Sequence, residues 1–230
     1  MNTTEWIGNA FRGDLVKQST LKAIKNVIGN DAFEKLVGHI LPRLIELGCR
    51  KALLALLNLQ EFKDGNPSLT FFNPVFHLLL STEVPPAELT VEDYRKAVGN
   101  PIVHPVHLAA LNPSGEPLKW INANIGAEEL KVKSGTGETV AHFAAVCDSD
   151  VNLKFAEEQG VDLGVKETEQ LQTPLMWCLR ANKSLDIAKH IVSTKGRGAL
   201  NDKDKEKFTP VQYLGRYGVQ GDASEWVNYF

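Results

Sequence analysis

Three histidines near the middle of the chain have a spacing that could bind a metal ion. His104 and His107 lie three residues apart, on one helical turn, and His142 follows further along the chain. A zinc site needs three or four converging ligands and a second layer of hydrogen bonds. Because no Cys-x-x-Cys, His-Glu-x-x-His or paired-carboxylate motif accompanies these histidines, we expect them to have a structural role and predict no metal site.

Cysteine is the next candidate for chemistry. Cys49, Cys147 and Cys178 cannot all pair with one another and have no Cys-x-x-Cys spacing, which indicates reduced thiols in a cytosolic type of compartment. His142 precedes Cys147 by five residues, but a nucleophilic thiol needs a base within hydrogen-bond reach and a lowered pKa. Nothing in the local sequence imposes that geometry, so we expect small core residues here and predict no catalytic residue.

Two short polar segments partly match ligand-binding loops. Residues 135–139 are rich in glycine, but the G-x-x-x-x-G-K-[ST] pattern of a phosphate loop is absent and no strand is predicted before them. Residues 202–206 resemble half of a calcium loop, but the glycine at its sixth position and the distal glutamate are missing. Both segments are predicted to be turns, and no cofactor is implied.

Several of these residues belong to a seven-residue phrase that recurs at intervals of about 35 residues. Its four copies begin at His104, Thr139, Thr173 and Thr209, and the clearest reads Thr-Val-Ala-His-Phe-Ala-Ala. A period of this length indicates stacked supersecondary units, each too small to bury its own apolar face.

Each unit is expected to contain two short helices. Threonine followed by proline opens the first helix, because the hydroxyl caps free N–H groups and proline stands where no N–H is missed. An amphipathic stretch at helical spacing then predicts the second helix. A glycine stands thirteen residues before the next phrase, at Gly126, Gly160 and Gly196, where a helix can end in the left-handed conformation. A polar segment, such as residues 133–138, connects one pair to the next.

The second copy, Gly137 to Ala145 followed by Gly160-Val161-Asp162, resembles the ankyrin repeat, which has about 33 residues and a T-P-L-H-x-A core. The resemblance covers about residues 70–218, with a weaker copy from Asn73. It implies an all-α fold, an ankyrin-like repeat solenoid of stacked helix pairs with hairpin-like turns. In this family the histidine of the phrase ties one turn to the next. The chain departs from the family core at His104, Val140, Met176, Gln212 and Leu214-Gly215.

Three segments are expected along the chain. Residues 1–65 form a helical N-terminal cap or decayed repeats, residues 66–218 form ankyrin-like repeats, and residues 219–230 form a C-terminal capping segment. In the last segment, Ala223–Phe230 is expected to fold back over the open face of the last unit.

The N-terminal segment is predicted to contain three helices. Hydrophobic spacing places one at about residues 15–28 and a second at about residues 33–47, where Pro42 requires a kink or a break. The third, Ala52–Leu59, is apolar nearly all round and is expected to be buried.

The resemblance also implies where a partner would bind: at the turn tips and at the outer positions of each first helix. Carried over to this chain, these are Thr136, Glu138, Glu169, Gln170, Gln172, Arg180, Lys205, Glu206, Phe208, Arg216 and Tyr217. Phe208, Arg216 and Tyr217 would form a cluster of the kind that dominates interface energies, unless the two aromatic residues pack against the C-terminal segment.

Phe143, Trp177 and Tyr213 occupy one variable position of the phrase, so in a stack they line up along one side. They either fill the seams between units or form an aromatic stripe on the concave surface that anchors a partner. Aromatic residues at repeat seams are usually core residues, which favours the first interpretation.

The composition limits the kinds of partner. Hydrophobic residues make up 43% of the 230 residues and charged residues 23%, as in ordinary globular proteins. The formal charge of −3 argues against nucleic acid and anionic membranes, and no apolar run is long enough to span a bilayer. Because the N-terminus does not resemble a signal peptide, we expect the cytoplasm or the nucleus.

We therefore expect a non-catalytic protein-binding module, such as a scaffold, inhibitor, escort or effector, that uses the concave face and the turn tips. One alternative is a small thiol-dependent or hydrolytic enzyme with the repeats as a targeting module. It is disfavoured because residues 12–64 contain almost no clustered acid, base or nucleophile. The other alternative is a self-associating structural subunit whose Ala52–Leu59 helix or C-terminal aromatic residues pair between chains.

Overall fold

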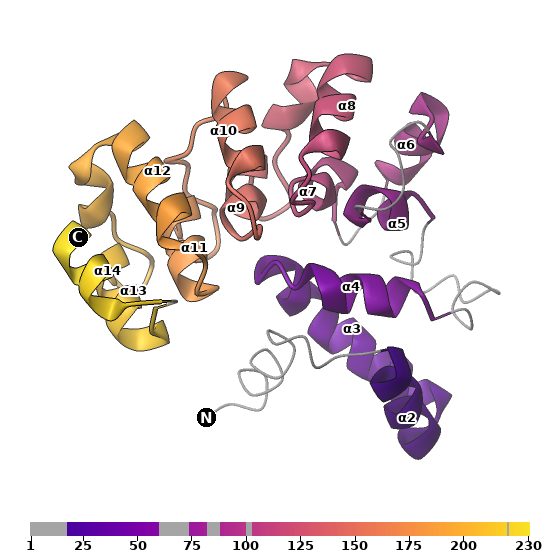
Figure 1. Cartoon of the computed structure of the whole chain (residues 1–230). Coiled ribbons are helices and arrows are strands. Elements are labelled where there is room, and N and C mark those ends of the chain that lie inside the picture. Colours follow the sequence, from indigo (N-terminus) through magenta and orange to yellow (C-terminus); the bar gives the residue numbers. More distant parts are fainter. Residues whose placement is uncertain (1–17, 60–73, 82–87, 100–102, 220) are drawn as a thin grey trace. The chain divides into compact units, whose positions relative to one another are not determined.

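The computed structural model describes residues 18–59, 74–81, 88–99, 103–219 and 221–230 (Figure 1). These residues form thirteen α-helices and short 3-10 helices, with no β-strand among them. The all-α prediction is thus confirmed for this part of the chain. Leu15 and Asn73, which were expected in a helix and in a weak repeat copy, lie outside the described residues. The chain consists of two compact units, Met1–Leu108 and Ala109–Phe230.

Helices of the first unit pack around α4. In chain order they are α2 (Gln18–Ile28), α3 (Asn30–Glu46), α4 (Arg50–Leu57), α5 (Pro74–Leu80) and α6 (Val91–Ala97). α4 contacts α2, α3 and α5, and α6 contacts α5. Four residues of α4 are buried, Ala52, Leu53, Leu56 and Leu57, so the buried third helix is confirmed.

α3 runs without interruption through Pro42. Proline has no N–H to bond the preceding turn, and its place in the last third of α3 leaves most of the helix unaffected. The helix ends at Glu46, and the chain then turns at Gly48, whose φ is 61°. Of the two expected alternatives at Pro42, a break of the helix is therefore excluded.

The second unit is a row of helix pairs (Figure 1). α7 (Pro105–Ala109) spans the junction of the two units; the later helices are α8 (Glu116–Asn124), α9 (Val140–Ala145), α10 (Val151–Glu158), α11 (Pro174–Arg180), α12 (Leu185–Lys195), α13 (Pro210–Tyr217) and α14 (Ala223–Tyr229). α9 packs against α10 and α11 against α12, while α11 also contacts α9 and α13. The first helices α9, α11 and α13 therefore lie beside one another, with α11 in the middle.

Local signals set where these first helices begin. Thr139, Thr173 and Thr209 are the N-caps of α9, α11 and α13, and all three have extended backbone. The hydroxyl of Thr173 accepts a hydrogen bond from the N–H of Met176 at 3.3 Å. Proline occupies the first position of α11 and α13. The predicted threonine-proline helix starts are therefore confirmed.

The glycines that close the second helices have the positive φ that the sequence predicts: 124° at Gly126, 80° at Gly160 and 79° at Gly196. At Gly160, its own N–H and that of the next residue donate to carbonyl groups of α10 at 2.8 and 2.9 Å. Gly126 and Gly196 have ψ of 159° and 165°, not the left-handed helical value. Each leads directly into a 3-10 helix, η3 (Ala127–Lys131) or η4 (Arg197–Asn201).

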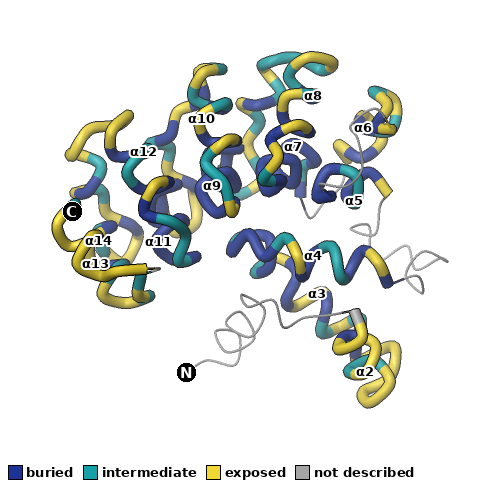
Figure 2. Tube along the Cα trace, in the orientation of Figure 1, coloured by how far each residue is buried: buried dark blue, intermediate teal, exposed yellow. Residues whose placement is uncertain are grey.

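The core of the second unit lies between the helices of each pair (Figure 2). Every residue of α9 and α11 is buried. The second helices bury one face, with Leu118, Ile121, Leu153, Ala156, Leu185, Ala188, Ile191 and Val192. The amphipathic second helices are thus confirmed, and burying one such leucine or isoleucine contributes about 1.5–3 kcal/mol.

Candidate functional site

The third residues of α7, α9, α11 and α13 mark the register of the phrase. They are His107, His142, Met176 and Gln212. In α13, glutamine replaces the histidine found at this position in α9. Its Oε1 accepts the N–H of the N-cap residue Thr209 at 2.8 Å, as Nδ1 of His142 does with Thr139. The four residues thus occupy the same position, the third, of their helices.

Both ring nitrogens of His142 form hydrogen bonds. Nδ1 accepts from the backbone N–H of Thr139 at 3.2 Å, so the ring hydrogen must be on Nε2. Nε2–H donates to the carbonyl oxygen of Gln172 at 3.2 Å. Burial lowers the pKa of His142 to about 4; the bond to Gln172 opposes this shift and the Arg180 charge adds to it. The ring is therefore neutral at pH 7 and joins one helix pair to the next.

A turn precedes each of α9, α11 and α13. In residues 134–138, 167–172 and 204–208, the first N–H donates to the last carbonyl at 2.9, 3.0 and 3.0 Å. The side chain of the first residue, a serine, a glutamate or an aspartate, accepts further N–H groups from within the turn. We call these three segments the turn row.

Neighbouring turns of the turn row are also bonded to each other. Thr168 donates its N–H and its hydroxyl to the carbonyl oxygen of Thr136, both at 2.8 Å. The N–H of Lys205 donates to the carbonyl oxygen of Gln170 at 2.7 Å. The backbone therefore holds the tips of the turn row in fixed relative positions.

One residue near the end of each turn has a positive φ: 87° at Gly137, 56° at Leu171 and 72° at Lys207. Glycine adopts this conformation readily, whereas leucine and lysine are strained in it. Leu171 and Lys207 are both exposed. Sequence reasoning missed these two residues, although their alignment with Gly137 in the repeat register was the available signal.

Most of the predicted tip residues are accessible. The exposed ones are Glu169, Gln170, Lys205 and Glu206. Thr136 and Glu138 are half-buried, and the hydroxyl of Thr136 donates to the carboxylate of Glu138. The side chains at the tips of the second and third turns are therefore more exposed to solvent than those of the first.

Gln172 and Arg180 correct the expectation of an outer position, because they are only 8% and 7% exposed. Nη1 of Arg180 donates to Oε1 of Gln172 at 2.9 Å. The guanidinium lies 5.1 Å from the ring centroid of Trp177. A long arginine side chain can fold back over a neighbouring ring, which its place in the phrase does not reveal.

The three aromatic residues of the variable position are buried, with 4% of Phe143, 3% of Trp177 and 3% of Tyr213 exposed. The rings of Phe143 and Trp177 meet edge to face at 5.5 Å. The hydroxyl of Tyr213 donates to the carboxylate of Asp204 at 2.7 Å, and burial together with this bond raises the pKa of Tyr213. These contacts favour the seam interpretation over an exposed stripe.

Phe208, Arg216 and Tyr217 come together at the end of the turn row. The guanidinium of Arg216 lies 5.3 Å from the ring centroid of Phe208 and 5.6 Å from that of Tyr217. Its Nη1 is 3.6 Å from the carboxylate of Glu206. Arg216 and Glu206 are exposed and the two rings are half-buried. We call these four residues the terminal cluster.

The C-terminal helix α14 packs beside α12 and η4. The hydroxyl of Tyr229 donates to the carbonyl oxygen of Lys189 at 3.2 Å, and Arg197 donates to the carbonyl oxygen of Tyr229 at 2.9 Å. Trp226 is buried. Phe208 contacts Arg216, and Tyr217 contacts both Arg216 and Tyr213.

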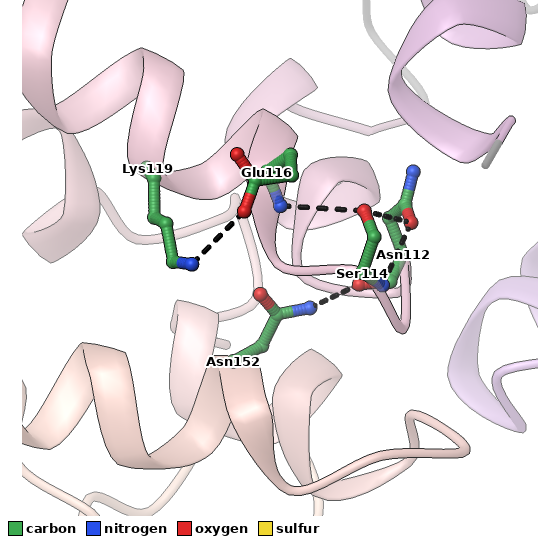
Figure 3. A network of polar contacts seen from close by, with 5 residues as sticks. All are labelled: Asn112, Ser114, Glu116, Lys119 and Asn152. Carbon is green, nitrogen blue, oxygen red and sulfur yellow. Dashed lines mark hydrogen bonds and ion pairs between the residues drawn. The ribbon is translucent and has the colours of Figure 1, made fainter. Parts of the chain in front are cut away.

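A second polar network joins α10 to the turn before α8 (Figure 3). Nδ2 of Asn152 donates to the carbonyl oxygens of Ala110 and Asn112 at 2.9 and 2.6 Å. Ser114 donates its N–H and its hydroxyl to Oδ1 of Asn112. Sequence reasoning missed Asn152, which is fully buried and joins two neighbouring helix pairs of the second unit.

The thiol and histidine side chains do not form the pair weighed from the sequence. Sγ of Cys147 donates to the carbonyl oxygen of Leu111 at 3.4 Å, and the nitrogens of His142 have the partners described above. Burial raises the pKa of the Cys147 thiol and raises that of Cys178 to about 12. Both thiols are therefore protonated at neutral pH.

Within the described ranges, no group of three or more histidine, cysteine, aspartate or glutamate side chains converges as metal ligands would. The rings of His104 and His107 lie with their centroids 5.7 Å apart. In the same part of the chain, no helix has the length and apolar character needed to cross a bilayer.

The turn row and the terminal cluster thus combine charged, apolar and aromatic side chains at exposed or half-buried positions. Comparison with protein-family models finds no match for this chain, and comparison with curated proteins finds none either.

Proposed function

We propose that this chain is an ankyrin-like repeat protein that binds another protein. The register of the four phrases and the contacts of α11 with α9 and α13 support this, since stacked helix pairs have such neighbours. In this proposal the chain recognises its partner with a preformed surface and has no catalytic or cofactor role. The cytoplasm or the nucleus remains the compartment that we infer from the sequence.

One observation carries the proposal: the hydrogen bonds between neighbouring turns. The bonds from Thr168 to Thr136 and from Lys205 to Gln170 fix the tip side chains before a partner arrives. A rigid surface loses little conformational freedom on binding, so modest contacts can give useful affinity.

Burial directs the contact to particular side chains. No residue of α9 or α11 is exposed, so we propose that the partner contacts the turn row and the terminal cluster rather than these inner helices. Arginine and aromatic side chains in contact are typical of the residues that dominate binding energy. Arg216 between Phe208 and Tyr217 is therefore the proposed centre of the surface.

Affinity capture from the native cell, followed by mass spectrometry, tests this proposal. The full chain with Phe208→Ala and Tyr217→Ala should keep its circular dichroism spectrum. Its partner should be captured at least about tenfold less, because hot-spot aromatic residues contribute about 2 kcal/mol or more. A variant with Val151→Ala and Val227→Ala removes exposed apolar side chains elsewhere and is the control. Equal capture by both variants would reject this surface.

A further inference from the structure

Aspartate and lysine alternate over residues 202–205, but the fold places the two kinds of side chain in different environments. Asp204 is buried and accepts the N–H of Phe208 at 2.8 Å in addition to the hydroxyl of Tyr213. The carboxylate of Asp202 lies 3.1 Å from the ammonium of Lys166. Both aspartates are therefore neutralised or turned inward, although the local sequence suggests a mixed surface.

The lysines of the same segment differ from these aspartates in their exposure. Lys203, Lys205 and Lys207 are exposed, and within the described part of the chain their ammonium groups form no ion pair. Arg216 adds a fourth exposed cation. Two exposed carboxylates lie on the same surface, Glu206 beside Arg216 and Glu169 on the neighbouring turn. A locally basic surface thus exists on a chain whose net charge is −3.

An apolar side chain stands beside these cations. Leu171 is 41% exposed with a φ of 56°, at the turn position where Gly137 stands in the preceding unit. Its turn is joined to the basic turn by the bond from Lys205 N–H to Gln170 O. Backbone strain of this kind is concentrated at functional sites. An exposed leucine held in a strained conformation therefore points to a binding contact.

We propose that the second and third turns bind an acidic segment of a partner protein, with carboxylates facing Lys205, Lys207 and Arg216 and an apolar side chain against Leu171. This inference rests on the proposed function and specifies the chemistry of its partner. Opposite charges at the edge of such an interface speed association and select the partner, while the apolar contact adds affinity.

A protein segment fits this surface better than a nucleic acid does. A phosphate backbone would meet Glu169 and Glu206 as well as the cations, and it offers nothing apolar to Leu171. Tight phosphate binding also depends on many cations, each releasing a counterion. A peptide can place carboxylates and an apolar side chain at separate positions, as this surface requires.

Fluorescence anisotropy on the full chain tests the inference. The probe is a labelled peptide of about twelve residues, glutamates with one central leucine, at low salt where exposed charges are weakly screened. Lys205→Glu with Lys207→Glu should weaken binding at least about tenfold, by removing attraction and adding repulsion. The control, Lys22→Glu with Lys35→Glu, makes the same change in net charge at exposed positions of α2 and α3 and should bind as the unmodified chain does.

A second variant separates the apolar contact from folding. Leu171→Gly removes the side chain while relieving the strained backbone, so it should bind the probe severalfold more weakly without loss of stability. Equal weakening in the control pair, or unchanged binding in Leu171→Gly, would overturn the inference. So would an oligothymidylate that binds more tightly than the probe and is lost in the same lysine variant.

Failure here is distinguishable from failure of the proposed function. If the acidic probe does not bind, but Phe208→Ala with Tyr217→Ala still loses a captured protein, the partner chemistry is wrong and protein binding stands. If neither the probe nor a protein depends on this surface, the proposed function itself is rejected.

Discussion

The Nε2–H of His142 donates to the carbonyl oxygen of Gln172 across 3.2 Å, although the two residues are thirty positions apart. Gln172 ends one turn of the turn row, and His142 lies in the helix of the preceding unit. The same ring accepts the N–H of Thr139. A protonated imidazole has no acceptor nitrogen, so the bond from the N–H of Thr139 exists only while the ring is neutral, and a charged ring at this buried position would also lack water.

Acid should therefore weaken the fold through His142. In the unfolded chain the ring takes up a proton near its ordinary pKa of 6.5, whereas in the folded chain burial delays this until about pH 4. The unfolded state thus binds more protons between these values, and the free energy of unfolding should fall by about 3 kcal/mol as the pH drops from about 6.5 to about 4. Urea unfolding at a series of pH values measures this.

His142→Gln provides the comparison for that titration. Glutamine can keep the bond to the N-cap, as Gln212 does in α13, but it does not titrate. The variant should lack the fall in stability assigned to His142, while His39→Gln, at an exposed position of α3, should retain it. Parallel curves for the unmodified chain and His142→Gln would show that the buried ring has no such effect.

Lys207→Gly should stabilise the protein. Lysine at a φ of 72° is strained, and its side chain forms no ion pair within the described residues. Relief of this strain should raise the free energy of unfolding by up to about 1 kcal/mol, less the extra freedom of glycine in the unfolded chain. Lys205→Gly, at a neighbouring exposed position without positive φ, should instead destabilise. Thermal unfolding of both variants decides whether the turn is strained.

Ala144→Leu should overpack the space between helices. Ala144 is fully buried in α9, where a larger side chain forces neighbouring groups apart and lowers stability by about 1–3 kcal/mol. Ala123→Leu adds the same atoms at an exposed position of α8 and should change stability little. Denaturant unfolding of both variants measures the difference. Equal midpoints would show that the site around Ala144 is not tightly packed.

The buried thiols should react slowly. Burial raises the pKa of Cys178 to about 12 and also raises that of Cys147, and only the thiolate reacts readily. Iodoacetamide at neutral pH should label both residues only after unfolding by urea, as followed by mass spectrometry of peptides. Rapid labelling of either one in the folded chain would instead favour the thiol-dependent enzyme.

Local features of the fold could be read from the sequence because short-range physics decides them. Thr173 followed by proline starts a helix, Gly160 ends one, and the spacing of Leu185 and Ile191 marks a buried face. Each depends on backbone geometry or on the helical period, which neighbouring residues determine. The all-α class and the ordered succession of helices followed from these signals.

The surface was decided by the tertiary structure. The direction of a side chain depends on its partners in the folded chain. The sequence therefore assigned Arg180 a position in the helix but did not predict that its guanidinium lies over the ring of Trp177. In the same way, Asp204 turns inward to Tyr213 while Lys205 and its neighbouring lysines stay exposed. The sequence by itself therefore determined the helices and their register, and only the packed units determined which charges and apolar groups a partner can meet.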